Sequence, residues 1–334
     1  MAFRFKAGES VSEGVKRVVL EELSSAAGGL SDDGQHKRRE TIHEARKSIK
    51  KVRGVLKLVR PELGRIYREE NTKLRDMGRQ LSAFRDADAI IETFDAVLER
   101  YHEQLRADSL GSIRKMLEQT KREHEQAGDL GKLMATAARV LRATMKGVSQ
   151  WPLKRDGFDA LAGGLESTYR DGRAAMRLAE SKNRAEHYHE WRKRAKDHWY
   201  HVRLLESLWT EVMQARENSL HDLETWLGDD HNLVVLCEQI ASDPDRYGGE
   251  QDVKLFVALA AEHQKELREK SLSLGQRVYE EKPKAFVGNL EKLWDAWQHQ
   301  PDAMKQEQKQ QREVAKKPAA KATSSTARAK SGTA

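Results

Sequence analysis

Two short segments place a histidine and several cations on one side of a helix. HEARKSIKK begins at His43, and HEWRKRAKD begins at His189. In both, cations follow the histidine at the third, fourth and seventh positions, a spacing that gathers side chains on one helical face. Arg offers a planar fork of donors and Lys a mobile point charge, and both form charge-assisted hydrogen bonds to phosphate oxygens. The two segments therefore predict helix faces that bind a long phosphate chain.

Each cationic face lies opposite an apolar one, so both segments predict helices with one side in a core. The first ridge consists of His43, Arg46, Lys47, Lys50, Arg53 and Lys57. The second ridge consists of His189, Arg192, Lys193, Lys196 and Arg203. Because Trp199 occupies the position that corresponds to Arg53, we expect the second ridge to be weaker, and we expect neither ridge to expose aromatic rings between its cations.

Repulsion within each ridge indicates an anionic partner. Like charges three or four residues apart destabilise an isolated helix by about 0.2–0.5 kcal/mol per pair. Either neighbouring carboxylates or a bound anion must relieve this cost. Cations one turn apart are separated by ~5.4 Å, so a polymer with repeated charge can meet several at once. Anion binding would favour the charged imidazolium of His43 and His189, so we expect affinity to rise as pH falls. Each histidine taken alone is better explained by a hydrogen bond between helices, but the recurrence of the whole constellation favours a ligand role.

Further cations could widen the ridges into a basin. The candidates are Lys16, Arg17, Arg75, Arg79, Arg85, Arg170 and Arg173. The alternative is that each is a solvated or ion-paired surface residue of little energetic importance.

The chain repeats itself at a constant offset of 146 residues. This shift carries each member of His43-Glu44, Arg46-Lys47 and Lys50 onto an identical residue, and it carries Arg85 onto His231. Agreement over nearly fifty residues without a gap predicts two similar helical bundles, one in each half, with boundaries at 1–150 and 151–300.

Hydrophobic periodicity predicts an all-α fold, since no segment alternates as a strand does between turn signals. Ser10 to Glu13 reads as a capping box that begins a first helix before Gly28-Gly29. The other expected helices span 36–60, 62–84, 86–106, 109–126, 132–147, 156–181, 185–212, 214–227, 230–241, 250–281 and 285–299. Residues 301–334 are expected to form a disordered basic tail, either an inert tether or a segment that touches a polyanion surface.

Charge distribution is more informative than the net charge of +7. The tail alone supplies +5, whereas residues 36–60 carry ten Lys or Arg against two Glu. Cys237 is the single cysteine, and no apolar run approaches the ~20 residues that cross a membrane. The start of the chain lacks the apolar stretch of a secretory signal. We therefore expect a cytoplasmic protein.

The chain resembles the CHAD family of conserved-histidine α-helical domains. FRFKAGESVSEGVKR resembles the opening of that family, the two histidine segments resemble its paired helices, and LSAFRDAD with LGDDHNL resemble the later element of each half. YRDGR at 169–173 also looks familial, and the resemblance covers roughly residues 3–300. It implies two four-helix bundles related by a pseudo-twofold axis, a basic central surface, and non-enzymatic binding of inorganic polyphosphate with association to polyphosphate granules. His231-Asn232 and Trp199-Tyr200 depart from the family pattern, so the second half should make fewer phosphate contacts.

Other functions remain open at this stage. Nucleic acid is a second polyanion, although base recognition usually needs exposed stacking aromatics. Phosphoryl transfer through His43 or His189 is a third possibility, although no P-loop or nucleophile elbow occurs. A metal site among the histidines at 187–201 is disfavoured, because His189 and His198 point about 180° apart and nearby cations repel metal ions. We expect no cofactor and no membrane contact, and the sequence does not indicate an oligomeric state.

Overall fold

The computed structural model describes residues 3–31, 38–82, 86–105, 110–126 and 130–299. Every regular element within these ranges is a helix, which confirms the all-α prediction. None of these helices combines the length and apolar character needed to cross a bilayer. Arg85 and the expected basic tail at 301–334 lie outside the described residues.

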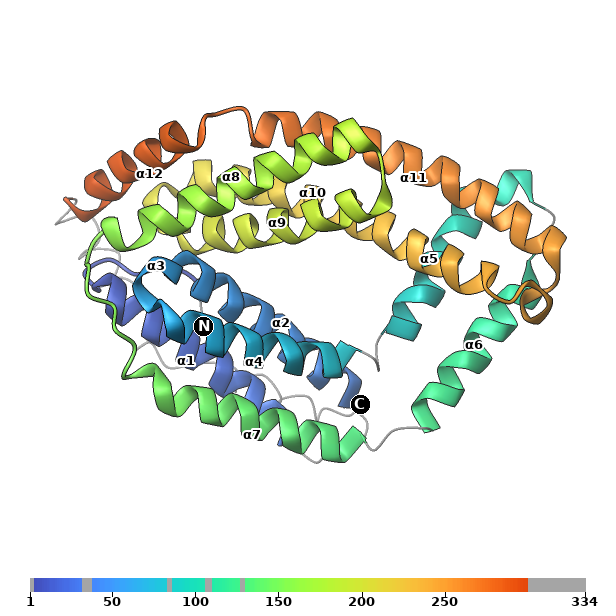
Figure 1. The fold of residues 1–334 in the computed structure, drawn as a ribbon, viewed down its shortest axis with the longest axis horizontal. Helices are drawn as coiled ribbons and strands as arrows, with labels where there is room; N and C mark the ends of the chain where they lie inside the picture. Colours follow the sequence, from blue (N-terminus) through green and yellow to red (C-terminus); the bar gives the residue numbers. More distant parts are fainter. Residues whose placement is uncertain (1–2, 32–37, 83–85, 106–109, 127–129, 300–334) are drawn as a thin grey trace, which may run out of the picture.

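A first group of helices comes from the first half of the chain. It consists of α1 (Val11–Gly29), α2 (Arg38–Leu58), α4 (Arg65–Ser82) and α7 (Leu130–Val148). Helix α2 packs between α1 and α4, while α7 contacts both of these (Figure 1). The capping box of Ser10 and Glu13 begins α1 as predicted. The short helix α3 (Arg60–Leu63) and Gly64, at a φ of 52°, turn the chain from α2 into α4.

A second group follows residue 150. It consists of α8 (Asp159–Lys182), α9 (Ala185–Leu204), α10 (Thr210–Ala241), α11 (Glu250–Val278) and α12 (Pro283–Gln298). Helix α9 packs between α8 and α10, α11 lies along α10, and α12 contacts α8. Because α2 contacts both α8 and α9, one hydrophobic core is continuous through the two groups.

Helices α5 (Asp86–Arg100) and α6 (Gly111–Gln126) pack away from the first group. They form a separate hydrophobic cluster with the distal parts of α10 and α11 (Figure 1). The rings of Phe94 and Phe256 stack there with centroids 5.0 Å apart. Helices α5 and α6 therefore precede residue 150 in the chain but pack on α10 and α11, which follow it.

Two predicted helix boundaries are wrong. The expected helices at 214–227 and 230–241 form the single helix α10. Gly228 does not interrupt it, because this glycine is buried against α9, where an added Cβ would lie 3.1 Å from the Arg192 guanidinium. Conversely, the expected helix at 185–212 is divided. Helix α9 ends at Leu204, and the 3-10 helix η3 (Glu206–Leu208) precedes α10. Two further 3-10 helices are η2 (His102–Gln104) and η4 (Pro244–Tyr247).

Candidate phosphate-binding groove

A groove rich in positive charge runs between α2, α4 and α9, and we call it the basic groove. It comprises two adjoining cavities, the larger of about 520 Å³. Among the described residues, ten Lys or Arg side chains and two carboxylates, Glu190 and Asp197, line it. The cations are Arg46, Lys50, Arg53, Lys57, Arg75, Arg79, Arg192, Lys193, Arg194 and Lys196. The sequence predicted nine of these ten, all but Arg194, and the fold brings the two ridges and two cations of α4 to one place.

The α2 wall of the groove has little carboxylate compensation. Nε of Arg53 donates a hydrogen bond to the neutral Asn71 amide oxygen at 2.9 Å. Lys50 forms no ion pair with the described residues. Although Lys50 is exposed along the groove, the surrounding walls desolvate its ammonium and Lys196 repels it, which together lower its pKa to about 7. A bound anion would offset both the desolvation of this ammonium and its repulsion by Lys196. Lys57 is the exception on this wall, because it pairs with Asp197 of α9.

The α9 wall is compensated by the protein itself. Oε1 of Glu224, on α10, lies 3.2 Å from Nη2 of Arg192 and 2.5 Å from Nζ of Lys196. Burial would raise the pKa of the Glu224 carboxyl, but the two cations hold that pKa below its ordinary value. On the exposed side, Lys193 pairs with Glu190 at 2.6 Å. Each of these three cations therefore already has a carboxylate partner.

The internal repeat explains this difference between the walls. At the offset of 146 residues, Glu224 corresponds to Gly78 and Glu217 corresponds to Asn71. Gly78 and Asn71 both line the basic groove. The first half thus carries a glycine and a neutral amide where the second half carries two carboxylates. The sequence comparison did not consider these two positions, although the same alignment contains them.

The histidines do not occupy equivalent places. His189 lines both cavities of the groove, and its ring lies against that of His231 with centroids 3.9 Å apart and a tilt of 33°. Burial and the adjacent Lys193 lower the pKa of His189, while burial and His189 lower that of His231 to about 4. Both rings are therefore neutral near pH 7. His43 lies one turn before Arg46 and outside the groove lining, with Nε2 3.7 Å from a Glu44 carboxylate oxygen.

Two predicted ridge residues lie outside the groove. Lys47 is exposed and pairs with Glu44 at 3.3 Å. Arg203 pairs with Glu217 at 2.9 Å, and its guanidinium lies 5.1 Å from the Trp199 ring centroid. Lys196 is therefore the last residue of the second ridge that lines the groove.

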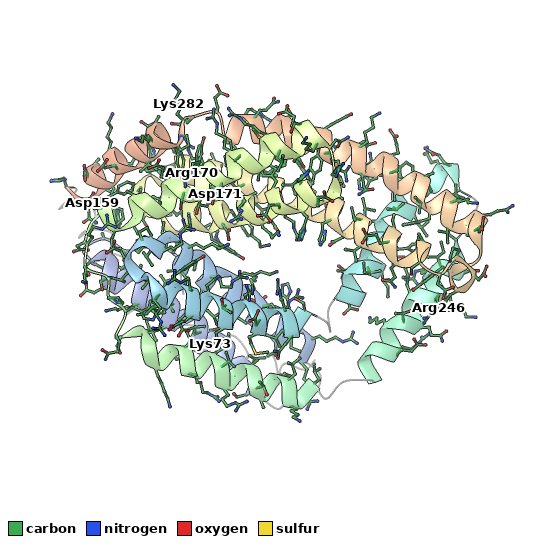
Figure 2. All side chains as sticks on the ribbon, in the orientation of Figure 1. Lys73, Asp159, Arg170, Asp171, Arg246 and Lys282 are labelled. Carbon is green, nitrogen blue, oxygen red and sulfur yellow. The ribbon has the colours of Figure 1, made fainter. Side chains whose placement is uncertain are left out.

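The other predicted cations among the described residues, Lys16, Arg17, Arg170 and Arg173, do not line the groove. Arg17 on α1 pairs with Glu9 at 2.6 Å and donates to the carbonyl of Arg4, so it fixes the start of the chain. Arg173 donates to the carbonyl of Tyr279 at 3.0 Å. Arg170 is exposed on α8 beside Asp171 (Figure 2).

Two tyrosines also contribute to the groove, although neither is an exposed ring between the cations of a ridge. Tyr67 and Tyr200 both line it. Tyr200 is only 3% exposed, and its ring stacks on Trp199 with centroids 5.2 Å apart. An added Cβ on Gly54 would lie 2.9 Å from Cβ of Tyr200, so this tyrosine packs directly against α2. Its contacts are those of a core residue between helices.

The histidines at the centre of α9 belong to the core. Nε2 of His201 is hydrogen bonded to the Gly54 carbonyl at 2.9 Å, and His198 packs among aromatic rings. Within the described ranges, no group of three or more His, Cys, Asp or Glu side chains is placed to hold a metal ion.

Comparison with known proteins agrees with the sequence features of this site. A family model described as the CHAD domain matches residues 20–241, which is more than half of the chain. This range includes every residue that lines the basic groove. No curated protein matches the chain.

Proposed function

Because the chain belongs to the CHAD domain family, we propose that it binds inorganic polyphosphate in the basic groove. The observation that carries this proposal is that ten cations and two carboxylates of the described residues line one groove. Asp76 and Glu224, outside the lining, pair with four of these cations, which are Arg75, Arg79, Arg192 and Lys196. Lys50 on one wall has no carboxylate partner among the described residues, and Arg53 bonds only to a neutral amide. A polyanion supplies the negative charge that these side chains lack.

The arrangement favours a chain of phosphates over a single phosphate. From Arg46 to Lys57, the four groove cations of α2 extend over about 16 Å of helix. Arg75 and Arg79 face them from α4, and Lys193 and Arg194 from α9. A single phosphate could contact only a few of these groups, whereas a polymer can contact both walls along the groove.

The proposed activity is binding without turnover. A histidine that acts as a general base needs a partner that orients its ring. Nδ1 of His189 is buried and makes no hydrogen bond with the described residues, and the ring lies against that of a second neutral histidine. This environment favours a role for His189 in contacting a bound anion over a role in transferring a proton. Release of phosphate from polyphosphate by pure protein, abolished in His189→Ala, would show the opposite.

The direct test is titration of the purified protein with polyphosphates of increasing length at several salt concentrations. We expect affinity to rise with chain length until the groove is filled, and to fall steeply with added salt. Binding that ignores both variables would refute the proposal. Competition with DNA and RNA at equal phosphate concentration tests the nucleic-acid alternative, and we expect neither to displace long polyphosphate.

In the cell, we propose a cytoplasmic protein that associates with polyphosphate granules. This rests on the proposed binding function. A fluorescent fusion should co-localise with granules, and the double variant Lys50→Glu/Arg53→Glu should be diffuse. Removal of residues 301–334 tests whether the basic tail contributes to this association.

We also propose that the two halves form four-helix bundles related by a pseudo-twofold axis. The repeat at 146 residues and the contact between α2 and α9 support this relation. An experimental structure of the polyphosphate complex tests it. The segments 38–82 and 184–228 should superpose after one rotation of about 180°.

A further inference from the structure

A second cavity lies on the other side of α9. It occupies about 490 Å³ between α9, α10 and the end of α11, and it shares no lining residue with the basic groove. His198 contributes to it from α9, at about 180° on the helical wheel from His189. Its volume is in the range typical of sites for small organic molecules. We call it the α10–α11 pocket.

The inner end of this pocket is apolar except for one histidine. Its walls there are Val202, Leu220, Leu274 and Val278. His198 is only 2% exposed, and neither of its ring nitrogens makes a hydrogen bond with the described residues. Burial lowers the pKa of His198 to about 3, so the ring is neutral and offers one donor and one acceptor. Buried polar groups in folded proteins nearly always have a partner, so this imidazole, which lines the pocket, is available to hydrogen bond with a polar group of a ligand.

The mouth of the pocket carries one free charge of each sign. Arg216 and Glu281 already pair with each other at 3.0 Å, and the Arg216 guanidinium lies over the Phe286 ring. Glu211 and Arg277 are exposed at the mouth and form no ion pair with the described residues. The exposed part of the pocket therefore offers one carboxylate and one guanidinium to a ligand.

We propose that the α10–α11 pocket binds a small zwitterion with an aromatic body and a hydroxyl at its far end, as in a hydroxylated aromatic amino acid. The carboxylate contacts Arg277 and the ammonium contacts Glu211. The ring lies between the aliphatic walls, and the hydroxyl forms a hydrogen bond with His198. This site is independent of polyphosphate binding, since none of these residues lines the basic groove.

Four probes that differ by one group test the assignment. L-tyrosine has every feature, whereas L-phenylalanine lacks the hydroxyl, tyramine the carboxylate, and 3-(4-hydroxyphenyl)propionate the ammonium. Binding is followed by NMR of the methyl groups of Val202, Leu220, Leu274 and Val278. We expect saturable shifts with L-tyrosine and about tenfold weaker binding of each of the other three. Equal affinity for tyrosine and phenylalanine, or no saturable shift with tyrosine, would overturn the proposal.

Variants separate the pocket from the rest of the fold. Ala215 is an exposed residue of the pocket wall, so Ala215→Trp should block the pocket and abolish tyrosine binding without disturbing the core. His198→Phe keeps a ring of similar size and should erase the preference for tyrosine over phenylalanine. Both variants should bind polyphosphate as the parent does. Retention of full tyrosine affinity in Ala215→Trp would place the ligand elsewhere and refute the assignment.

Discussion

The two walls of the basic groove come from equivalent segments of a repeated sequence, yet they are not electrostatically equivalent. Lys50 and Lys196 occupy the same position of the repeat. Lys196 lies 2.5 Å from a Glu224 carboxylate oxygen, whereas Lys50 has no carboxylate within ion-pair distance among the described residues. Both halves keep the lysine at this position, but only the second half carries the carboxylate that neutralises it, because Gly78 stands where Glu224 does.

This difference assigns separate roles to the walls. On the α9 wall, cations and Glu224 form a part-buried network whose charges satisfy one another. Such a network contributes to folding and leaves less charge for a ligand. On the α2 wall, Lys50 and Arg53 face the groove without a carboxylate of their own, and folding tolerates the repulsion. The α2 wall should therefore dominate the affinity for polyphosphate, while the α9 wall should dominate stability.

The largest expected effect is on the α9 wall. In Glu224→Gln, Arg192 and Lys196 lose the carboxylate that they share, and two partly buried cations remain next to each other. Removing one partner of a buried ion pair costs roughly 3 kcal/mol, so we expect a loss of about that size in the free energy of unfolding. Urea denaturation measures it. Saturating polyphosphate should restore much of the loss, because the freed cations become available to the ligand.

The matched control is Asp222→Asn, an exposed carboxylate on the same helix whose nearest cation partner is His221 at 3.9 Å. We expect its unfolding free energy to change by less than ~0.5 kcal/mol. A similar loss in both variants would mean that Glu224 has no special role, and the contrast between the walls would fail.

The next effect comes from giving the α2 wall the carboxylates it lacks. Asn71→Asp preserves the size of the side chain and places a charge beside Arg53. Gly78→Glu restores the acid that corresponds to Glu224, and an added Cβ there meets only Ile49, at an ordinary 3.5 Å. We expect each variant to weaken polyphosphate binding about tenfold while raising stability slightly. Fluorescence titration with long-chain polyphosphate measures the affinity.

Gly78→Gln is the control for this pair, because it adds the same bulk and helix propensity without charge. Its affinity should stay within about twofold of the parent. If Gly78→Gln weakens binding as much as Gly78→Glu, access to the groove rather than charge limits the affinity.

These comparisons also show what the sequence could predict. Periodicity predicted the helices and the cationic ridges because apolar and charged residues alternate with the helical period along α2 and α9. It could not predict that α5 and α6 pack on α10 and α11, because the same amphipathic helix can pack on either half. Nor could it exclude Arg203 from the groove, since the partner that holds it, Glu217, lies on another helix. The residues of each ridge could be identified from the local sequence. The ion-pair partner of each cation depends on tertiary contacts, which the local sequence does not contain.

A smaller effect is expected from pH, and Lys50 is the residue through which it can be tested. Its pKa is lowered from 10.5 to about 7 by desolvation and by Lys196, Arg46 and Arg192, with Glu224 opposing them. Between pH 7 and pH 10 the unfolded chain therefore binds a proton at Lys50 that the native protein does not. The free energy of unfolding contributed by this group rises with pH over that window. In Lys50→Met, this part of the rise should be absent.

Bound polyphosphate should raise the pKa of Lys50, because a nearby anion stabilises the protonated ammonium. Binding at pH 8 should take up protons in the parent protein, and affinity should fall several-fold between pH 7 and pH 9. Calorimetry in buffers of different ionisation enthalpy measures the uptake. Lys50→Met should show less uptake at pH 8. Below pH 7 the two proteins should take up similar numbers of protons on binding, since Lys50 is already protonated in the parent and the titrating groups there are His189 and His231, whose pKa values are lowered. Unchanged proton uptake in Lys50→Met would assign the effect to other groups.

The smallest expected effect compares one arginine of each ridge as a phosphate ligand. Arg53 and Arg203 are both predicted phosphate ligands, but only Arg53 lines the groove. Arg203 is held by Glu217 and by the ring of Trp199, so the ligand would have to break both contacts to use it. We expect Arg203→Gln to change polyphosphate affinity less than twofold, whereas Arg53→Gln should weaken it about tenfold. Comparable losses in the two variants would mean that Arg203 leaves Glu217 on binding, and the second ridge would then extend as far along the polymer as the first.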